Sequence, residues 1–280
     1  TSTGGYGAYG INLSSTTAVT GTEISNNMIS DIITDGDGTS TTFNAFGIRL
    51  AGGTGTKVYY NSVNLSGPLT SQTTVDLSAA LVVTTSSVTG LDLRNNVLAN
   101  SITGGTGTKS YAMYLSSAAS VGTFNNNDYY VSGPNGVLAY VAADKTTLAA
   151  LAAATTQDAA SVSVNPVFVS ATDLHTNAFD LNNAGTPVSV TVDFDGDARS
   201  ASTPDIGADE FSLPQAGDLT PTALVSPATT STCYSPAETV TVSIRNVGGG
   251  AADFAATPAT VTVVVTPPSG TAVTLTTTLS

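Results

Sequence analysis

The sequence predicts an all-β protein: a right-handed parallel β-helix, a solenoid, over residues 1–213, a linker over 214–217, and a partial immunoglobulin-like β-sandwich over 218–280. Short apolar runs recur every 31 to 37 residues, which predicts the solenoid. Within each run, apolar side chains alternate with polar or small ones, which is the period of a strand. The composition, rich in Thr, Val, Gly and Asn with only 10% charged residues, agrees with strands joined by turns.

The first set of runs, GINL, GIRL, ALVV and AMYL, is expected to provide one strand from each coil. One inward column is Ile11, Ile48, Leu81 and Met113. A second, two residues on, is Leu13, Leu50, Val83 and Leu115. The positions between them are expected to face outward and to form no regular array: Asn12, Arg49, Val82 and Tyr114.

The second set of runs aligns on one asparagine per coil. Three residues earlier stand Ile24, Val58, Leu93 and Phe124. Two residues later stand Ile29, Val63, Leu98 and Tyr129. In stacked coils, carboxamides in register donate to one neighbour and accept from the other. The sequence therefore predicts a structural ladder of Asn27, Asn61, Asn96 and Asn127.

The hexapeptide GGTGTK occurs twice, at 52–57 and at 104–109. A phosphate-binding loop requires the spacing GxxxxGK[ST] and a following helix, whereas strands are expected to follow here. A Thr-based ice-binding face would need both copies at one position of successive coils. One copy precedes the Asn61 strand and the other the Met113 strand, so we interpret both as glycine-rich corners.

Charge and cysteine count narrow the class of protein. The net charge of −13 disfavours nucleic acid and anionic membrane surfaces as partners. No apolar run of about eighteen residues occurs, so no membrane insertion is predicted. Cys233 is the only cysteine, and it is either a free thiol or paired outside this chain. The start, TSTGGYGAYG, lacks signal-peptide features and falls within a repeat, so we expect an excerpt of a longer chain.

Beyond residue 146 the motifs become more specific. TTLAALAAATTQ, at 146–157, predicts a short helix with Asp144 as its N-cap. The stretches QDAASVSVNPVFVSATDLH and DFDGDARSASTPDIGADEF follow, at 157–175 and 193–211. In these motifs the chain resembles secreted bacterial right-handed parallel β-helix repeat proteins, common in Bacteroidetes. The resemblance covers about residues 1–213. It implies an extracellular, secreted or cell-surface protein, often exported by a type IX system with a C-terminal sorting domain.

After residue 218, the runs ALVSP, ETVTVSIRN, ATVTVVVTP and TAVTLTTTL alternate with turns at NVGGG and PPSG. This pattern predicts about four strands of a sandwich. The module resembles the adhesion-type sandwiches that follow such β-helices.

Catalytic groups are not expected to converge in these coils. A pectate-lyase-like enzyme needs a base and a cation for the carboxylate of its substrate. The basic residues of the coils fall at different corners or columns: Arg49, Lys57, Arg94 and Lys109. The single histidine, His175, lies in the DLH motif, where we expect a packing role. We therefore predict no catalytic residue, no enzyme, and no cofactor apart from Ca²⁺.

The densest group of acids is a candidate Ca²⁺ site. Asp193, Asp195 and Asp197 have the alternate spacing with which carboxylates converge on this ion. An EF-hand would place Glu twelve residues in, where Pro204 stands. The alternative is an ion pair between Arg199 and a nearby acid that closes the last coil. The sequence leaves both interpretations open.

For function, we expect a noncatalytic, adhesin-like surface protein that binds polysaccharide or cell-surface glycans and neighbours other modules of the same chain. The alternative is a polysaccharide lyase or glycoside hydrolase whose groove lies in earlier coils. A third option is self-association into an extracellular filament through strand edges.

Overall fold

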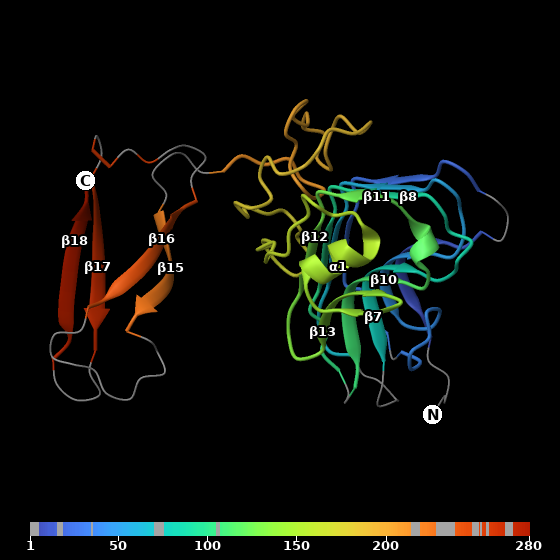
Figure 1. Cartoon of the computed structure of the whole chain (residues 1–280), viewed down its shortest axis with the longest axis horizontal. Coiled ribbons are helices and arrows are strands. Elements are labelled where there is room, and N and C mark those ends of the chain that lie inside the picture. Colours follow the sequence, from blue (N-terminus) through green and yellow to red (C-terminus); the bar gives the residue numbers. More distant parts are fainter. Residues whose placement is uncertain are drawn as a thin grey trace. The chain divides into compact units, whose positions relative to one another are not determined.

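The computed structural model describes residues 6–15, 19–34, 36–69, 76–104, 107–213, 219–227, 239–247, 252, 254–255, 258–266 and 271–280. It divides into two compact units, Thr1–Phe211 and Ser212–Ser280. The first unit is a parallel β-solenoid followed by a short helix and a long irregular segment (Figure 1). In the described ranges, no helix is long and apolar enough to cross a membrane. The prediction for Cys233 lies outside these ranges.

Three parallel sheets form the walls of the solenoid, and each coil adds one strand to each sheet. The first sheet contains β1 (Ala8–Leu13), β4 (Ala45–Leu50), β7 (Leu77–Val83), β10 (Lys109–Leu115), β13 (Gly136–Val141) and the antiparallel β14 (Ala143–Lys145). The second contains β2 (Glu23–Ser25), β5 (Lys57–Tyr59), β8 (Leu91–Arg94) and β11 (Val121–Asn125). The third contains β3 (Met28–Ser30), β6 (Ser62–Leu65), β9 (Val97–Asn100) and β12 (Asp128–Val131). A 3₁₀ turn, Ala118–Ser120, precedes β11.

The strand register confirms the predicted apolar columns. In the first sheet Ile11 pairs with Ile48, Ile48 with Leu81, and Leu81 with Met113. The column through Val58 and the column through Val63 pair in the same way in the second and third sheets. These side chains form one continuous buried core between the three walls. Burying an unbroken apolar row is what holds successive coils together.

The first sheet has one position in its early coils where only a small residue fits. Gly47 occupies this position in β4, and a Cβ there would lie 2.3 Å from Cγ1 of Val63 and 2.5 Å from the carbonyl oxygen of Ala80. Gly10 has the equivalent conflict with Ile29. The glycines of GINL and GIRL therefore let side chains of the third sheet approach the first sheet closely.

The corner between the second and third sheets has a left-handed backbone in every coil. The residue before each ladder asparagine has positive φ: Asn26, Tyr60, Asn95 and Asn126. Asparagine tolerates this region well, and Tyr60 is the exception. The turn brings the next carboxamide inside, where Asn27 donates to Asn61 (2.8 Å), Asn61 to Asn96 (2.9 Å) and Asn96 to Asn127 (3.0 Å).

Helix α1 (Leu148–Thr155) covers the last coil, and Leu151 is fully buried in the core. The predicted N-cap was wrong: Thr147 caps the helix, and its Oγ1 accepts from the N–H of Ala150 at 3.2 Å. Asp144 is unavailable because it lies in β14 and contacts Lys109 and Tyr111.

Residues 156–211, the terminal segment, run back past the coils along the left-handed corners. Asn126 donates to the carbonyl of Ala184 (2.9 Å), Asn95 to that of Thr186 (2.7 Å), and Asn26 to that of Val192 (2.7 Å). A small apolar cluster packs the terminal segment against the outer side of the third sheet: Val97, Ala178, Leu181 and Ile206.

The second unit contains the four predicted strands as two antiparallel pairs. One pair is β15 (Leu219–Ser226) with β16 (Thr241–Asn246), and the other is β17 (Ala259–Val265) with β18 (Val273–Leu279). Residues of both pairs line a cavity of about 210 Å³. The assignment as an immunoglobulin-like sandwich stays a prediction.

Candidate functional site

The outer face of the first sheet carries aromatic residues at the end nearest helix α1. In register, Tyr111 of β10 pairs with Val137 of β13, and Tyr114 pairs with Tyr140. These positions point away from the core because the inward positions of the same strands are taken by Met113 and its equivalents. One strand position, repeated in adjacent coils, thus places two tyrosine rings side by side.

The three tyrosines form a compact cluster. The rings of Tyr114 and Tyr140 are stacked, with centroids 4.4 Å apart and planes 7° from parallel. Tyr111 meets the ring of Tyr114 edge-on at 5.4 Å and that of Tyr140 at 6.3 Å. Such contacts fix ring orientation, so the cluster is rigid. The stacked rings cover each other's inner faces, which leaves their outer faces and edges to meet a ligand.

Charged groups border this cluster. The Tyr111 hydroxyl donates to Oδ1 of Asp144 at 2.8 Å, and Lys109 forms an ion pair with Oδ2 of the same carboxylate. Burial, and then the bond to Asp144, raise the pKa of Tyr111 far above its ordinary value, so the phenol stays a neutral donor. Burial alone would raise the pKa of Asp144, but hydrogen bonds from Lys109 and Tyr111 outweigh it and lower that pKa. Asp144 is therefore ionised at neutral pH.

These groups line a groove of about 320 Å³. Its other walls come from the preceding coils: Thr39, Asp76, Leu77 and Gly107. Asp76 is buried, and its Oδ1 accepts from the N–H of Gly38 at 3.1 Å. The groove therefore combines an aromatic floor with two carboxylates and one ammonium group, which is the usual make-up of a small-ligand site.

The opposite end of the same face is closed. Tyr9 and Phe46 stack with centroids 6.2 Å apart, and the guanidinium of Arg49 lies 5.3 Å from the centroid of Tyr9. Arg49 also donates to the carbonyl of Thr41, and Tyr9 to that of Thr42, so the 39–44 loop covers these rings. The groove described above lies at the other end of the face, near α1.

Sequence reasoning missed this cluster. Tyr114 was expected to face outward, but in a row that formed no array. The missing information is the fifth strand of the sheet: GVLAYV, at 136–141, repeats the pattern of SYAMYL and places Tyr140 beside Tyr114. Aligning that run with the earlier coils would have revealed the pair.

Arg94, another basic residue of the coils, has structural partners. Arg94 pairs with Asp92 at 2.7 Å and lies over the ring of Tyr59. Lys57 begins β5 in the second sheet, whereas Lys109 begins β10 in the first. The two GGTGTK copies thus precede strands of different walls, as predicted. Gly53 and Gly55 of the first copy have positive φ, which suits a tight turn.

The acids of the DxDGD motif take different positions. Asp193 is buried, and its carboxylate accepts the backbone N–H groups of Asp195, Asp197 and Glu210. The side chain of Asp195 contacts His175 instead, and Asp197 is exposed. The prediction that Asp193, Asp195 and Asp197 bind Ca²⁺ stays a prediction.

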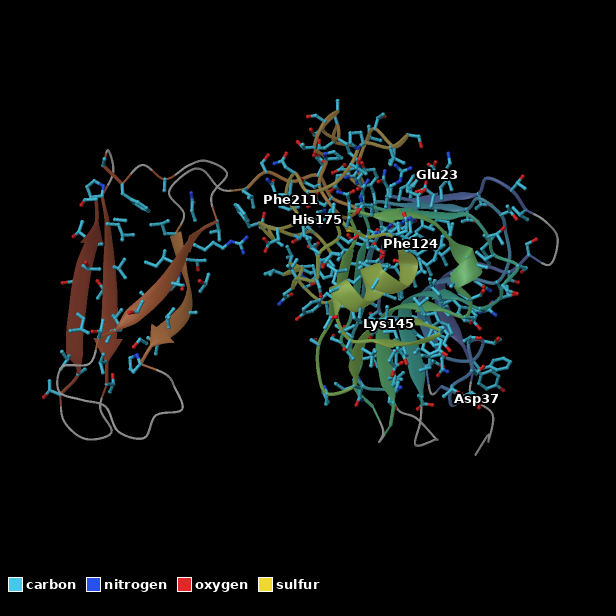
Figure 2. All side chains as sticks on the ribbon, in the orientation of Figure 1. Glu23, Asp37, Phe124, Lys145, His175 and Phe211 are labelled. Atoms are coloured by element: carbon cyan, nitrogen blue, oxygen red, sulfur yellow. The ribbon has the colours of Figure 1, made fainter. Side chains whose placement is uncertain are left out.

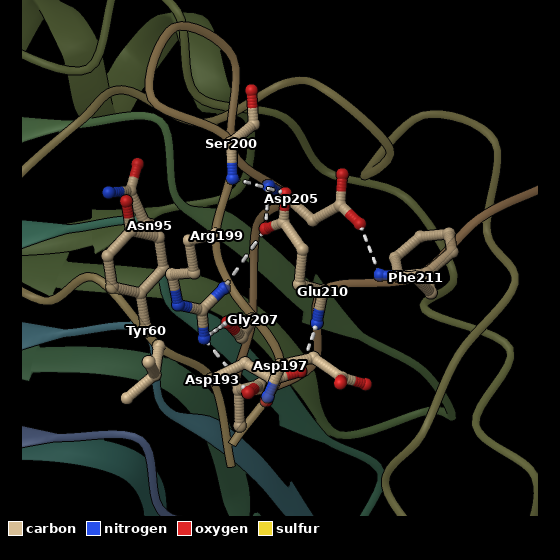
Figure 3. A network of polar contacts seen from close by, with 12 residues as sticks. Tyr60, Asn95, Asp193, Asp197, Arg199, Ser200, Asp205, Gly207, Glu210 and Phe211 are labelled. Carbon is tan, nitrogen blue, oxygen red and sulfur yellow. Dashed lines mark hydrogen bonds and ion pairs between the residues drawn. The ribbon is translucent and has the colours of Figure 1, made fainter. Parts of the chain in front are cut away.

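Arg199 organises the end of the motif (Figure 3). Its guanidinium is 3.8 Å from the centroid of the Tyr60 ring and donates to the carbonyls of Gly207 and Ala208. It also pairs with Glu210 at 3.4 Å, the kind of ion pair that the sequence left open. Burial lowers the pKa of Arg199 and raises that of Tyr60 to about 12.

Comparison of the chain with protein-family models, with curated proteins and with solved structures found no match.

Proposed function

We propose that this protein is a noncatalytic, extracellular, glycan-binding scaffold, with the groove at Tyr114 and Tyr140 as its sugar site. The observation that carries the proposal is the stacked tyrosine pair in a groove of about 320 Å³. One face of a pyranose ring presents C–H groups that pack flat against an aromatic ring, while its hydroxyls need both donors and acceptors at the rim. Lys109, Tyr111 and Asp144 supply these groups.

The charges favour a neutral glycan over an acidic one. The rim contains two carboxylates, of Asp76 and Asp144, against one ammonium group of Lys109. The whole chain has a net charge of −13. A polymer of uronic acids would be repelled by both the rim and the long-range field, so we propose neutral hexose oligosaccharides as ligands.

The test is binding of the complete chain to immobilised neutral and acidic oligosaccharides, followed by calorimetry on those that bind. Tyr114→Ala and Tyr140→Ala should each weaken binding by about 10- to 100-fold, since each removes about 1.5–3 kcal/mol of apolar contact. Tyr6→Ala is the matched control, because Tyr6 is 71% exposed and lies outside the groove. Equal affinity of all three variants for every glycan would refute the proposal.

A glycoside hydrolase is the second candidate, favoured by one observation: Asp76 and Asp144 line the same groove. Hydrolysis requires one carboxyl group that stays protonated as a general acid, with an ionised partner. Asp144, with its lowered pKa, fits only the ionised role. Release of reducing ends from neutral oligosaccharides, abolished in Asp144→Asn, would establish the enzyme and displace the noncatalytic proposal.

A further inference from the structure

The terminal segment gathers an imidazole and two carboxylates outside the groove. One ligand atom from each of His175, Asp195 and Asp209 lies within 4.8 Å of the others. Nε2 of His175 is 2.8 Å from Oδ2 of Asp195. Figure 2 shows His175 in the irregular part of the chain that follows α1. His175 is the only histidine of the protein, so this is the one place where an imidazole meets acids.

A third carboxylate orients the imidazole from its other side. Nδ1 of His175 hydrogen-bonds to Oδ1 of Asp173, which leaves Nε2 facing Asp195 and Asp209. Histidines that bind metals almost always donate their second ring nitrogen to a carboxylate or carbonyl in this way, because the bond fixes the tautomer and the ring plane. The geometry is therefore that of a ligand with its outer-shell partner.

The backbone that carries the two acids is held by hydrogen bonds. Oδ1 of the buried Asp193 accepts the N–H of Asp195 at 3.0 Å, and Oδ2 accepts the N–H of Glu210, next to Asp209, at 2.9 Å. The turns that carry Asp195 and Asp209 are further joined by the bond from the N–H of Phe194 to the carbonyl of Ala208, at 2.9 Å. Figure 3 shows Asp193 and Glu210 in this network.

The stretch of chain that carries His175 is fixed next to Asp209. Asp209 accepts the backbone N–H of Thr176, the residue after His175. Thr176 itself is fixed by its hydroxyl, which donates to the carbonyl of Pro166, and by its bridge to Phe168. The backbone next to His175 is therefore fixed relative to Asp209.

We propose that His175, Asp195 and Asp209 bind one first-row divalent transition-metal ion, of which Zn²⁺ is the representative case, with Asp173 as the positioning residue. An imidazole nitrogen with two carboxylates is a donor set for Zn²⁺, whereas Ca²⁺ takes oxygen ligands only. The ion offsets the charge of three clustered carboxylates. Asp193, assigned to Ca²⁺ from the sequence, here holds the turns and does not bind the ion.

The site links three stretches of the terminal segment, 173–176, 193–197 and 207–210, that otherwise meet through hydrogen bonds. An ion that binds the folded segment and not the unfolded chain stabilises it by mass action. Zn²⁺ is therefore a structural element of the segment that closes the solenoid corners.

The experiment is calorimetric titration of the complete, untagged chain with ZnCl₂, since a histidine tag would itself bind zinc. One equivalent should bind. Asp173→Asn should weaken binding by about 10- to 100-fold, as expected of an outer-shell partner, and His175→Ala by more than that. Asp197→Asn is the matched control: Asp197 is an exposed acid of the same turn, and its replacement should change affinity less than twofold.

A second measurement does not depend on variants that fold poorly. Because the chain has one histidine, ¹⁵N labelling of that residue yields one pair of imidazole signals. Zn²⁺ should shift the Nε2 signal of the unmodified protein at one equivalent, whereas CaCl₂ should not. An unmoved signal would overturn the proposal. Zinc affinity unchanged in His175→Ala, or tighter binding of Ca²⁺ that is lost in Asp197→Asn, would also overturn it, and the latter result would favour the Asp193–Asp197 site.

Discussion

Replacement of Asn96 by alanine tests the carboxamide ladder at its most buried point. Nδ2 of Asn96 donates to the carbonyls of Val58 (2.8 Å) and Arg94 (2.9 Å) and to Oδ1 of Asn127 (3.0 Å). Oδ1 accepts from the backbone N–H and from Nδ2 of Asn61, at 3.0 and 2.9 Å. The side chain is fully buried, so water cannot replace these bonds.

The expected loss of stability depends on which hydrogen bonds the partners of Asn96 keep after the substitution. Nδ2 of Asn61 retains the carbonyls of Ile24 and Tyr59 as acceptors, but its backbone N–H loses the one acceptor that it has in the structure. A buried, unpaired N–H costs about 1–3 kcal/mol, and the remaining lost bonds contribute about 0.5–1.5 kcal/mol each. Four such bonds are lost, so these contributions sum to about 3–9 kcal/mol, and we expect Asn96→Ala to lower the free energy of unfolding of the solenoid by at least about 3 kcal/mol.

Two matched variants serve as controls for the size of the stability loss in Asn96→Ala. Asn27, at the first coil, is only half-buried and donates to the carbonyl of Ser25 and to Asn61, so Asn27→Ala should cost about 1–2 kcal/mol. Asn135 makes one 3.3 Å bond at the surface, and Asn135→Ala should stay within about 0.5 kcal/mol of the unmodified protein.

Urea unfolding followed by far-ultraviolet circular dichroism suits the assay, because the chain has no tryptophan. Hydrogen–deuterium exchange of β8 and β9 assigns the loss to the solenoid. An Asn96→Ala protein as stable as Asn135→Ala would refute the ladder as a source of stability. A cost below that of Asn27→Ala would refute the dependence on burial.

Two further predictions concern the terminal segment. Arg199→Ala leaves Tyr60 without its stacked cation, removes the side-chain donor to the carbonyl of Gly207, and leaves the carbonyl of Ala208 with the N–H of Phe194 alone. Limited proteolysis should therefore cleave residues 184–211 at least tenfold faster, with the solenoid core intact; an unchanged rate would contradict this. Burial raises the pKa of Asp128 well above its ordinary value, and its carboxylate accepts the N–H of Val164 at 2.9 Å. Asp128 therefore keeps its proton in the folded protein at pH values at which the unfolded chain has lost it. Unfolding then releases this proton, so the free energy of unfolding falls as pH rises, by at most about 1.4 kcal/mol per pH unit for one group. Asp128→Asn keeps the acceptor and should make the profile between pH 5 and 7 shallower by up to that amount, as measured by urea unfolding; an identical profile would show that Asp128 is ionised in the folded state.

The walls of the solenoid were predictable because their signal is local and repeated. Each strand shows its inward side chains at period two, and the asparagine after each corner marks the coil, so Ile24, Val58 and Leu93 could be aligned without any structure. A wrong alignment would have moved apolar residues to the surface, which makes the register a strong constraint.

The groove and the cluster of His175, Asp195 and Asp209 were not predictable from the period-two pattern of the strands. Tyr114 and Tyr140 meet because two coils stack, but the rim acid Asp144 is held by Lys109, 35 residues earlier. The acids of the DxDGD motif have a recognisable spacing, yet the imidazole beside Asp195 comes from 20 residues away. The terminal segment has no strand or helix period, and its route along the corners follows from single carboxamide and guanidinium contacts.

One of those contacts sets the order in which the molecule can be completed. Arg199 donates to Oδ1 of Asn26, which precedes it by 173 residues. The corner at Asn26 is therefore locked only after the chain has been made as far as Arg199. Contacts of such long sequence separation slow folding, so this corner of the solenoid closes later than the strands that pair between neighbouring coils.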